Sequence, residues 1–185
     1  MRAVSTSGHE IMLRRATVAD AERIVRWHGE PDMTDHMPMR LLTVEQMRAQ
    51  LSARAEVVIG PMAVRTAEWI IEIDGESAGR IRLTVESRAH KIASLGYSLS
   101  GAHRGKGAMS TAVRLVTALA LDPTSFDIER VEAIASVENP ASCRVLERSG
   151  FHFEGVRRGY LIIRGRRVDH ASYSRLRSDQ EQAAP

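Results

Sequence analysis

Residues 92–121 read IASLGYSLSGAHRGKGAMSTAVRLVTALAL and combine two periodicities on either side of a glycine-rich turn. In the first part Ala93, Leu95, Tyr97 and Leu99 alternate with small residues, which is typical of a half-buried strand. In the last part apolar residues recur every three or four positions, which predicts a helix. The apolar positions of this helix are Met109, Ala112, Val113, Val116, Leu119 and Ala120.

The turn between the two, residues 101–107, has the sequence GAHRGKG. A strand that enters a helix through such a turn directs backbone N–H groups, the positive end of the helix dipole and cationic side chains at one point. The turn therefore predicts an anion site, most simply for a phosphate. It matches neither a Walker A loop, because only three residues separate Gly101 from Gly105-Lys106, nor a Rossmann fingerprint, because Ser110 occupies the third glycine position.

The remaining patterns predict an α/β fold with the element order β-α-α-β-β-β-α-β-α-β-β. Thr17 and Thr43 are candidate N-caps for the first two helices, and Asn139-Pro140 opens the last one. Asp74-Gly75 and Arg164-Gly165 predict hairpin turns. We expect one domain at residues 10–176, with flexible ends at 1–9 and 177–185. The predicted strands lie near residues 10–16, 69–73, 80–85, 93–99, 131–137, 151–163 and 166–176.

The composition is that of an ordinary globular protein, with 43% hydrophobic and 26% charged residues. No apolar run approaches the roughly 20 residues of a membrane span, and no signal peptide is evident, so we expect a cytoplasmic protein without membrane contact. The single Cys143 excludes an intramolecular disulfide, and the seven His residues show no metal-ligand spacing. A net charge of +3 with only 4% aromatic residues makes a nucleic-acid partner unlikely.

Two motifs and a closing hairpin carry a family resemblance. Arg104 and Gly107 match Arg/Gln-x-x-Gly-x-Gly/Ala, although Met109 replaces its final small residue. Residues 137–151, VENPASCRVLERSGF, match Asn-x-x-(Ala/Ser)-x-x-x-x-Glu-x-x-Gly-Phe, and GRRVDH follows at 165–170. The chain thus resembles the GCN5-related N-acetyltransferases (GNAT), in particular their RimJ/RimL branch, which acetylates N-terminal amines of ribosomal proteins. This resemblance implies a single-domain fold with a mixed, mostly antiparallel central sheet flanked by helices.

The resemblance also implies acetyl-CoA as co-substrate, no metal, and a set of site residues. The glycine-rich turn would grip the pyrophosphate, and the strand before it would run beside the pantetheine. The backbone N–H of Leu99 would polarise the thioester carbonyl, and Asn139 would bind the pantetheine arm while also capping its helix. The residues assigned to coenzyme A in this way are Tyr97, Ser98, Leu99, Arg104, Gly105, Lys106, Gly107, Ala108, Met109, Asn139 and Ser142.

The proton donor departs from the common family pattern, because Leu146 stands where many members have Tyr. Ser142 lies about one turn earlier on the same helical face. In the RimJ/RimL branch a serine there can serve the sulfur, so Ser142 is a catalytic candidate; packing under the cofactor is the alternative. Cys143 is expected on another face, in the core.

The base and the acceptor site leave more alternatives open. Glu68, Glu72, Glu132 and Glu154 are candidate bases, and each could instead belong to a structural ion pair. The loop after the first helix could receive a cationic substrate or simply be solvated. Its polar residues are Glu30, Asp32, Asp35 and His36. Asp169-His170 is expected to be a structural pair.

The function predicted from these observations is direct transfer of acetyl from acetyl-CoA to a primary amine in a ternary complex. The favoured acceptor is a peptide or protein N-terminal α-amine. The alternatives are a small amine (an aminoglycoside, polyamine or amino acid), a non-catalytic acyl-CoA-binding module and, more weakly, an RNA-associated basic protein. We expect a monomer or homodimer.

Overall fold

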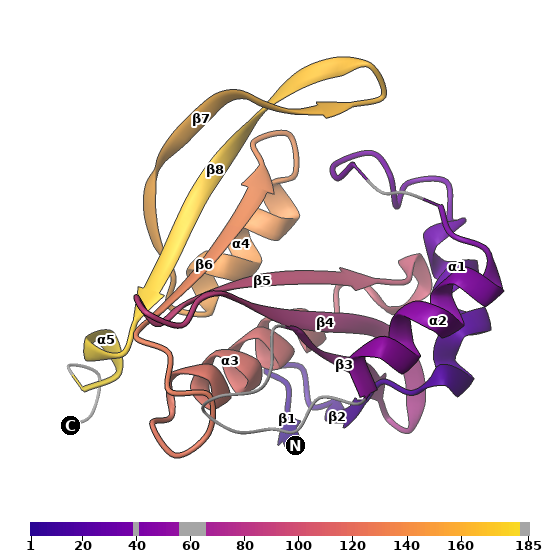
Figure 1. Cartoon of the computed structure of the whole chain (residues 1–185), viewed down its shortest axis with the longest axis horizontal. Helices are drawn as coiled ribbons and strands as arrows, with labels where there is room; N and C mark the ends of the chain where they lie inside the picture. Colours follow the sequence, from indigo (N-terminus) through magenta and orange to yellow (C-terminus); the bar gives the residue numbers. More distant parts are fainter. Residues whose placement is uncertain (39–40, 56–65, 182–185) are drawn as a thin grey trace.

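The computed structural model describes residues 1–38, 41–55 and 66–181. Within them an eight-stranded sheet has the order β1-β2-β3-β4-β5-β6-β8-β7, and every neighbouring pair is antiparallel except β5 and β6 (Figure 1). The predicted mixed, mostly antiparallel α/β fold is therefore confirmed. The strands are β1 (Arg2–Val4), β2 (Glu10–Arg15), β3 (Thr66–Ile73), β4 (Glu76–Ser87), β5 (Ile92–Leu99), β6 (Arg130–Ser136), β7 (His152–Ile163) and β8 (Arg166–Leu176).

Helices cover both faces of the sheet. The α-helices are α1 (Ala21–His28), α2 (Val44–Ala55), α3 (Ala108–Leu121), α4 (Pro140–Arg148) and α5 (Ser178–Glu181), with short 3-10 turns η1 (Val18–Asp20) and η2 (Gly101–His103). Ile70 of β3 packs in a cluster with α1 and α2, whereas its neighbours Trp69 and Ile71 belong to the larger core with α3. Because successive strand residues point to opposite faces, burial on both sides explains the three consecutive apolar residues 69–71 in β3.

The pairing of β5 with β6 is short and determines where a cavity forms. The parallel register holds for only three residue pairs, from Ile92–Arg130 to Ser94–Glu132. Beyond them β5 stays paired to β4 as far as Leu99, while β6 continues against β8. The sheet therefore splits, and the two strands diverge toward the glycine-rich turn and the start of α4 (Figure 1).

The N-terminal residues differ from the expectation of a flexible segment at 1–9. Arg2–Val4 pairs with β2, and the Met1 ammonium donates to the Leu13 carbonyl at 2.9 Å. Ser5 is buried, and the Ser7 hydroxyl donates to the Lys106 carbonyl at 2.5 Å. These contacts join residues far apart in sequence, so the short polar segment gives no local signal of them. At the other end α5 occupies 178–181, and residues 182–185 lie outside the described part.

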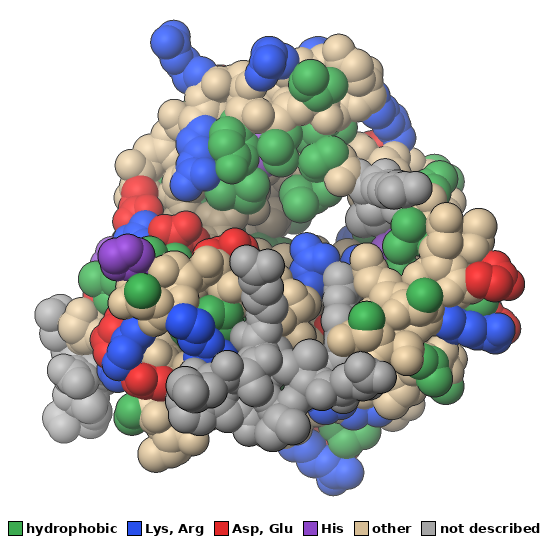
Figure 2. All heavy atoms as spheres, in the orientation of Figure 1, with side chains coloured by type: hydrophobic (Ala, Val, Ile, Leu, Met, Phe, Trp, Pro, Cys, Tyr) green, Lys and Arg blue, Asp and Glu red, His purple; other side chains and the backbone are tan. Residues whose placement is uncertain are grey.

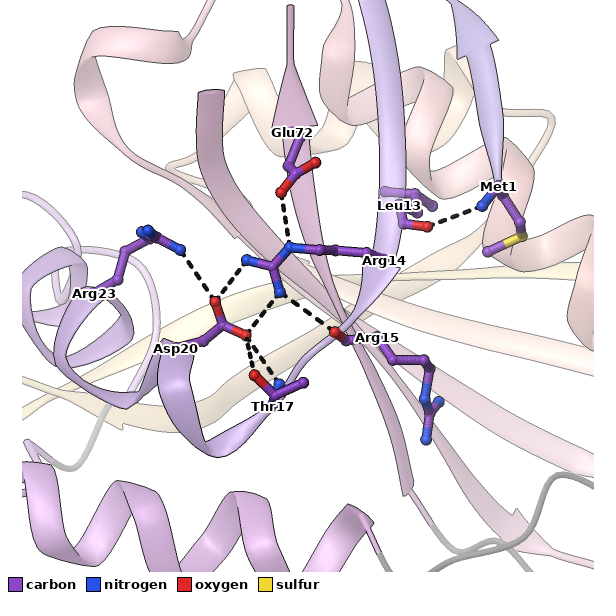
Figure 3. Close-up of polar contacts among 8 residues, drawn as sticks. All are labelled: Met1, Leu13, Arg14, Arg15, Thr17, Asp20, Arg23 and Glu72. Atoms are coloured by element: carbon purple, nitrogen blue, oxygen red, sulfur yellow. Dashed lines mark hydrogen bonds and ion pairs between the residues drawn. The ribbon is translucent and has the colours of Figure 1, made fainter. Parts of the chain in front are cut away.

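A network of charged side chains joins β2, β3 and the entry to α1 (Figure 3). Arg14 donates to Asp20 at 2.6 Å and to Glu72 at 2.7 Å, and Arg23 also donates to Asp20. The Asp20 carboxylate accepts from the Thr17 backbone N–H at 2.9 Å, which agrees with the predicted helix start. The guanidinium and these hydrogen bonds hold the pKa of Asp20 below its usual value. Glu72, a candidate base, is committed to this network.

No helix in the described ranges is long and apolar enough to cross a lipid bilayer.

Candidate active site

A cavity of about 640 Å³ fills the split between β5 and β6. It is lined by residues 95–99 of β5, 134–136 of β6, the glycine-rich turn, the first turn of α3, residues along the length of α4, and part of the loop after α1. All the residues that the sequence assigns to coenzyme A lie in this lining. Figure 2 shows an opening in the surface beneath the β7–β8 hairpin, above the body of the sheet.

The glycine-rich turn presents the N-terminus of α3 to the cavity. Gly107 is the N-cap with φ 69°, and in the described part of the chain no side chain caps the helix. The first N–H groups of α3 therefore have no partner within the helix, and they can donate to an anion. A Cβ at Gly107 would lie 3.0 Å from Thr6 Oγ1, so the N-terminal segment packs closely against this turn.

Cationic side chains accompany those donors. Lys106, Arg144 and Arg148 line the cavity beside the turn. Backbone N–H groups together with lysine and arginine are the donor set that phosphates require. The residues present therefore fit a pyrophosphate-bearing ligand such as coenzyme A.

Arg104 lies in the turn but is engaged with the protein itself. Its guanidinium donates to the Leu99 carbonyl at 3.2 Å and forms a two-pronged ion pair with Asp32 in the loop after α1. This hydrogen-bonded partner holds the pKa of Asp32 below its ordinary value. Arg104 thus links the turn to the loop, and neither sequence motif indicated that contact.

The backbone of β5 directs Leu99 toward the split. Ser100 donates its N–H to Ala78 of β4 at 2.9 Å. Because N–H groups of successive strand residues point to opposite edges, the N–H of Leu99 is directed away from β4, toward the cavity. Gly79 lies opposite Leu99, and a Cβ there would come within 2.3 Å of the Ser98 carbonyl oxygen. The close approach of β4 therefore requires glycine at this position.

The start of α4 brings two sequence-predicted residues to the cavity. Asn139 Oδ1 accepts from the Ser142 backbone N–H at 3.1 Å, so Asn139 is the predicted helix cap. The Ser142 hydroxyl lies 2.9 Å from the Tyr97 hydroxyl. Leu146 is fully buried in the core and offers no polar group. Cys143 is half-buried with its thiol near the Ser136 carbonyl, as a core-facing residue would be.

The four candidate bases do not meet in the cavity. Glu68 pairs with Arg80 at 2.7 Å, and Glu132 and Glu154 share Arg130 at 2.7 and 2.6 Å. Glu72 belongs to the network around Arg14. Within the described ranges, Asp32 is the only carboxylate of the cavity lining, and it is paired with Arg104. The structure therefore places all four glutamates in structural ion pairs, which was their alternative interpretation.

The loop after α1 is held on two sides. Glu30 accepts from the Gly101 N–H at 2.8 Å. Arg164, at the tip of the β7–β8 hairpin, forms an ion pair with Asp35 and donates to the Pro31 carbonyl at 3.1 Å. The hairpin tip thus reaches across to this loop, as Figure 1 shows. His36 lines the cavity without such a tether. Sequence reasoning missed Arg164, since nothing local distinguishes it from the other arginines of the hairpin.

Asp169 and His170 serve the hairpin separately rather than as a pair. Asp169 accepts from the Gly159 N–H at 2.7 Å. His170 is fully buried, with Nδ1 3.0 Å from the Val168 carbonyl and its ring edge-on to Tyr160. In the described part of the chain no group of three or more His, Cys, Asp or Glu side chains is arranged to hold a metal ion.

Comparison with known proteins agrees with this geometry. The family model "Acetyltransferase (GNAT) domain" matches residues 10–152. The probable N-acetyltransferase YjcK of Bacillus subtilis is 43% identical over 94 residues, and the match spans about half of each protein, 51%.

Two solved structures share the fold. RimJ of Mycobacterium smegmatis, in complex with CoA-disulfide, superimposes with a TM-score of 0.80 at 22% identity. The match covers 99% of this chain and 93% of the RimJ chain. Spermidine N-acetyltransferase of Vibrio cholerae, in complex with CoA and spermine, superimposes with a TM-score of 0.79 at 17% identity. The match covers 91% of this chain and 96% of that protein. At such identities the likeness extends to the fold alone.

Proposed function

This chain belongs to the GNAT acetyltransferase family, and from that premise we propose that its acceptor is the N-terminal α-amine of a peptide or protein. As a GNAT enzyme it is an acetyl-CoA-dependent N-acetyltransferase. The observation that carries the proposal is the charge of the cavity, whose one carboxylate in the described lining, Asp32, is neutralised by Arg104. Asp35 beside it is neutralised by Arg164. A polycation would find no unpaired acid there, whereas a single neutral amine needs none.

The proposed roles of the site residues follow from their positions. Acetyl-CoA supplies the acetyl group as an activated thioester. The N–H groups at the start of α3, together with Lys106, bind its pyrophosphate. The Leu99 N–H stabilises negative charge on the thioester oxygen, and Ser142 lies where it can serve the sulfur. Asn139 caps the helix through its side-chain oxygen. Its side-chain NH2 group can therefore donate to the pantetheine arm.

Within the described lining no unpaired carboxylate is present to act as a base, and this also favours an α-amine. An amine must be uncharged to attack, and an N-terminal amine has a pKa near 8, compared with about 10.4 for lysine. At pH 8 the neutral fraction of the α-amine is on the order of a hundredfold larger. The α-amine therefore needs little help from the protein to lose its proton.

The shape of the site supports the same acceptor. The Arg164 tether joins the hairpin tip to the loop after α1, above the cavity that contains Tyr97 and Ser142. The opening that remains beneath the hairpin (Figure 2) suits a narrow, extended chain end. The apolar neighbours Met33 and Met37 line this region and suit uncharged side chains next to the amine.

The test offers the enzyme one peptide that carries both an α-amine and a lysine, together with its N-terminally blocked form and spermidine. Acetylation is measured by thiol release and located by mass spectrometry. We expect modification of the α-amine, and little or none of the blocked peptide. Acetylation confined to lysine would contradict the proposal, and turnover of spermidine alone would replace it by small-amine acetylation.

A pair of variants tests the electrostatic reasoning. Arg164→Gln leaves Asp35 without its arginine. Arg167→Gln is the control, because it removes a neighbouring hairpin charge that donates to the Gly159 carbonyl at 2.8 Å. We expect Arg164→Gln to raise kcat/KM for spermidine relative to the peptide by up to about fivefold, as for an exposed ion pair. The same change in both variants would show that the Asp35 pair has no part in acceptor selection.

A further inference from the structure

Two hydrogen-bonded hydroxyls belong to residues that line the cavity. The Tyr97 hydroxyl is 2.9 Å from Ser142 Oγ and 3.4 Å from the Ser142 carbonyl oxygen. Tyr97 comes from β5 and Ser142 from the first turn of α4, 45 residues later. Both residues line the cavity. Two elements on opposite sides of the split thus meet through these two groups.

The positions of both hydroxyls are fixed by their elements. Tyr97 pairs with Ile81 in the β4–β5 register and packs against the main core, which anchors its ring. Ser142 is held by its backbone N–H, which donates to Asn139 Oδ1 at 3.1 Å. Pro140 begins the helix and removes one competing donor there. The hydroxyl contact therefore joins two restrained side chains.

The direction of the hydrogen bond follows from acid strength. A phenol is a far stronger acid than an aliphatic alcohol, so tyrosine is the better donor in such a pair. Burial raises the pKa of Tyr97 above its ordinary value, so the phenol is protonated and able to donate at neutral pH. If Tyr97 donates to Ser142 Oγ, the proton of Ser142 is free to turn into the cavity.

The position one turn along α4 offers no substitute. Leu146 is fully buried and packs in the core. The Tyr173 hydroxyl, also near α4, donates to Glu147 at 3.1 Å, and Tyr173 is absent from the cavity lining. A polar contact from α4 to the sulfur of coenzyme A therefore depends on Ser142 and on Tyr97, whose hydroxyl contacts it.

We propose that Tyr97 is a positioning residue that donates its hydroxyl to Ser142 Oγ and so directs the Ser142 proton at the sulfur of coenzyme A. This inference rests on the proposed function. When the carbon–sulfur bond breaks, its electron pair stays on sulfur, and Ser142 donates a hydrogen bond to that charge. The proton released by the acceptor amine finally balances the charge as free thiol forms. Tyr97 keeps its own proton throughout.

The test measures the thiol pKa of bound coenzyme A from the ultraviolet absorbance of the thiolate, with the desulfo-CoA complex as blank. The proteins are wild type, Tyr97→Phe, Ser142→Ala and the double variant, with Tyr173→Phe as the matched control. A hydrogen bond to the thiolate lowers the thiol pKa. We expect Tyr97→Phe and Ser142→Ala each to raise it by about one unit, a tenfold change in the ionisation constant.

Non-additivity is the decisive result. If the two hydroxyls act as one unit, the double variant shows no larger shift than either single variant. In turnover, Tyr97→Phe lowers kcat by about tenfold with KM for acetyl-CoA within about twofold. Unchanged affinity for desulfo-CoA shows that the variant sites are intact.

Three outcomes would overturn the inference. They are an unchanged thiol pKa in Tyr97→Phe, additive shifts in the double variant, and an equal shift in Tyr173→Phe. Failure of the wild-type protein to bind either coenzyme A or desulfo-CoA would instead refute the proposed function itself, and the inference with it.

Discussion

The buried histidine at the end of α1 should make the protein sensitive to mild acid. His28 is 4% exposed, and neither ring nitrogen has a hydrogen-bond partner among the residues that the structure describes. Burial lowers its pKa from 6.5 to about 4, and the nearby Arg80 and Arg82 act in the same direction while Glu68 opposes them. The folded state therefore prefers neutral His28, and protonation favours unfolding.

The sign and size of the effect follow from these two values. Because the folded pKa is depressed, this contribution to stability is fully present above the unfolded pKa of 6.5 and is lost as the pH falls toward 4. Between pH 7.5 and pH 5 the free energy of unfolding should fall by about 2 kcal/mol from this group alone. Most carboxylates remain ionised in both states over that window, so they contribute much less.

Urea denaturation followed by tryptophan fluorescence at the two pH values measures this loss. His28→Leu removes the titrating group, and His152→Leu provides the control, since the side chain of His152 is 74% exposed. We expect the loss to shrink by about 2 kcal/mol in His28→Leu and to stay unchanged in His152→Leu. An equal pH dependence in wild type and His28→Leu would refute the reasoning, because another group would then carry the titration.

Two further predictions concern Gly107, which lines the cavity, and Gly79, which lies opposite Leu99 in β4. Gly107→Asp should abolish the stabilisation by acetyl-CoA, about 2.7 kcal/mol at a hundredfold excess over Kd, because a carboxylate would enter the pyrophosphate site. Thermal shift checks this, and Gly165→Asp, at another positive φ but with open space around it, should retain the full shift. Gly79→Ala should lower the free energy of unfolding by about 1–3 kcal/mol, since its Cβ would overlap the Ser98 carbonyl. Gly96→Ala in the facing strand meets only Arg82 at 3.6 Å, and an equal loss in urea denaturation there would argue against the close approach at Gly79.

Arg104 connects the end of β5 to the loop after α1, because it contacts both the Leu99 carbonyl and Asp32. The same guanidinium holds the carbonyl of Leu99, whose N–H faces the cavity. The loop after α1 is therefore connected to the end of β5 through one side chain. On the opposite side Arg164 connects that loop to the hairpin. Acidic residues that suggested a cation site in the sequence are thus used to fasten the loop.

Local sequence patterns were sufficient for the elements that carry the cofactor motifs. The strand, turn and helix of residues 92–121 were predicted because alternation, glycine and helical spacing act within a few residues. For the same reason Asn139-Pro140 identified the start of α4, where the asparagine side chain caps a residue three positions later. The residues that the family motifs assign to coenzyme A all line one cavity.

Long-range pairing decided the rest, because many partners are chemically equivalent until the chain is folded. From the sequence, any of the four candidate glutamates could have been available as a base. In the structure each of them forms an ion pair with an arginine, as Glu72 does with Arg14, 58 residues away. The strand at residues 2–4 exists only because β2 offers an edge, since so short a segment has no stability of its own. The contact between Tyr97 and Ser142 likewise depends on how far β5 and β6 diverge, a property of sheet register and twist that no local pattern encodes. The sequence alone thus determined the fold and the cofactor turn, whereas the tertiary structure decided which charges remain available to an acceptor.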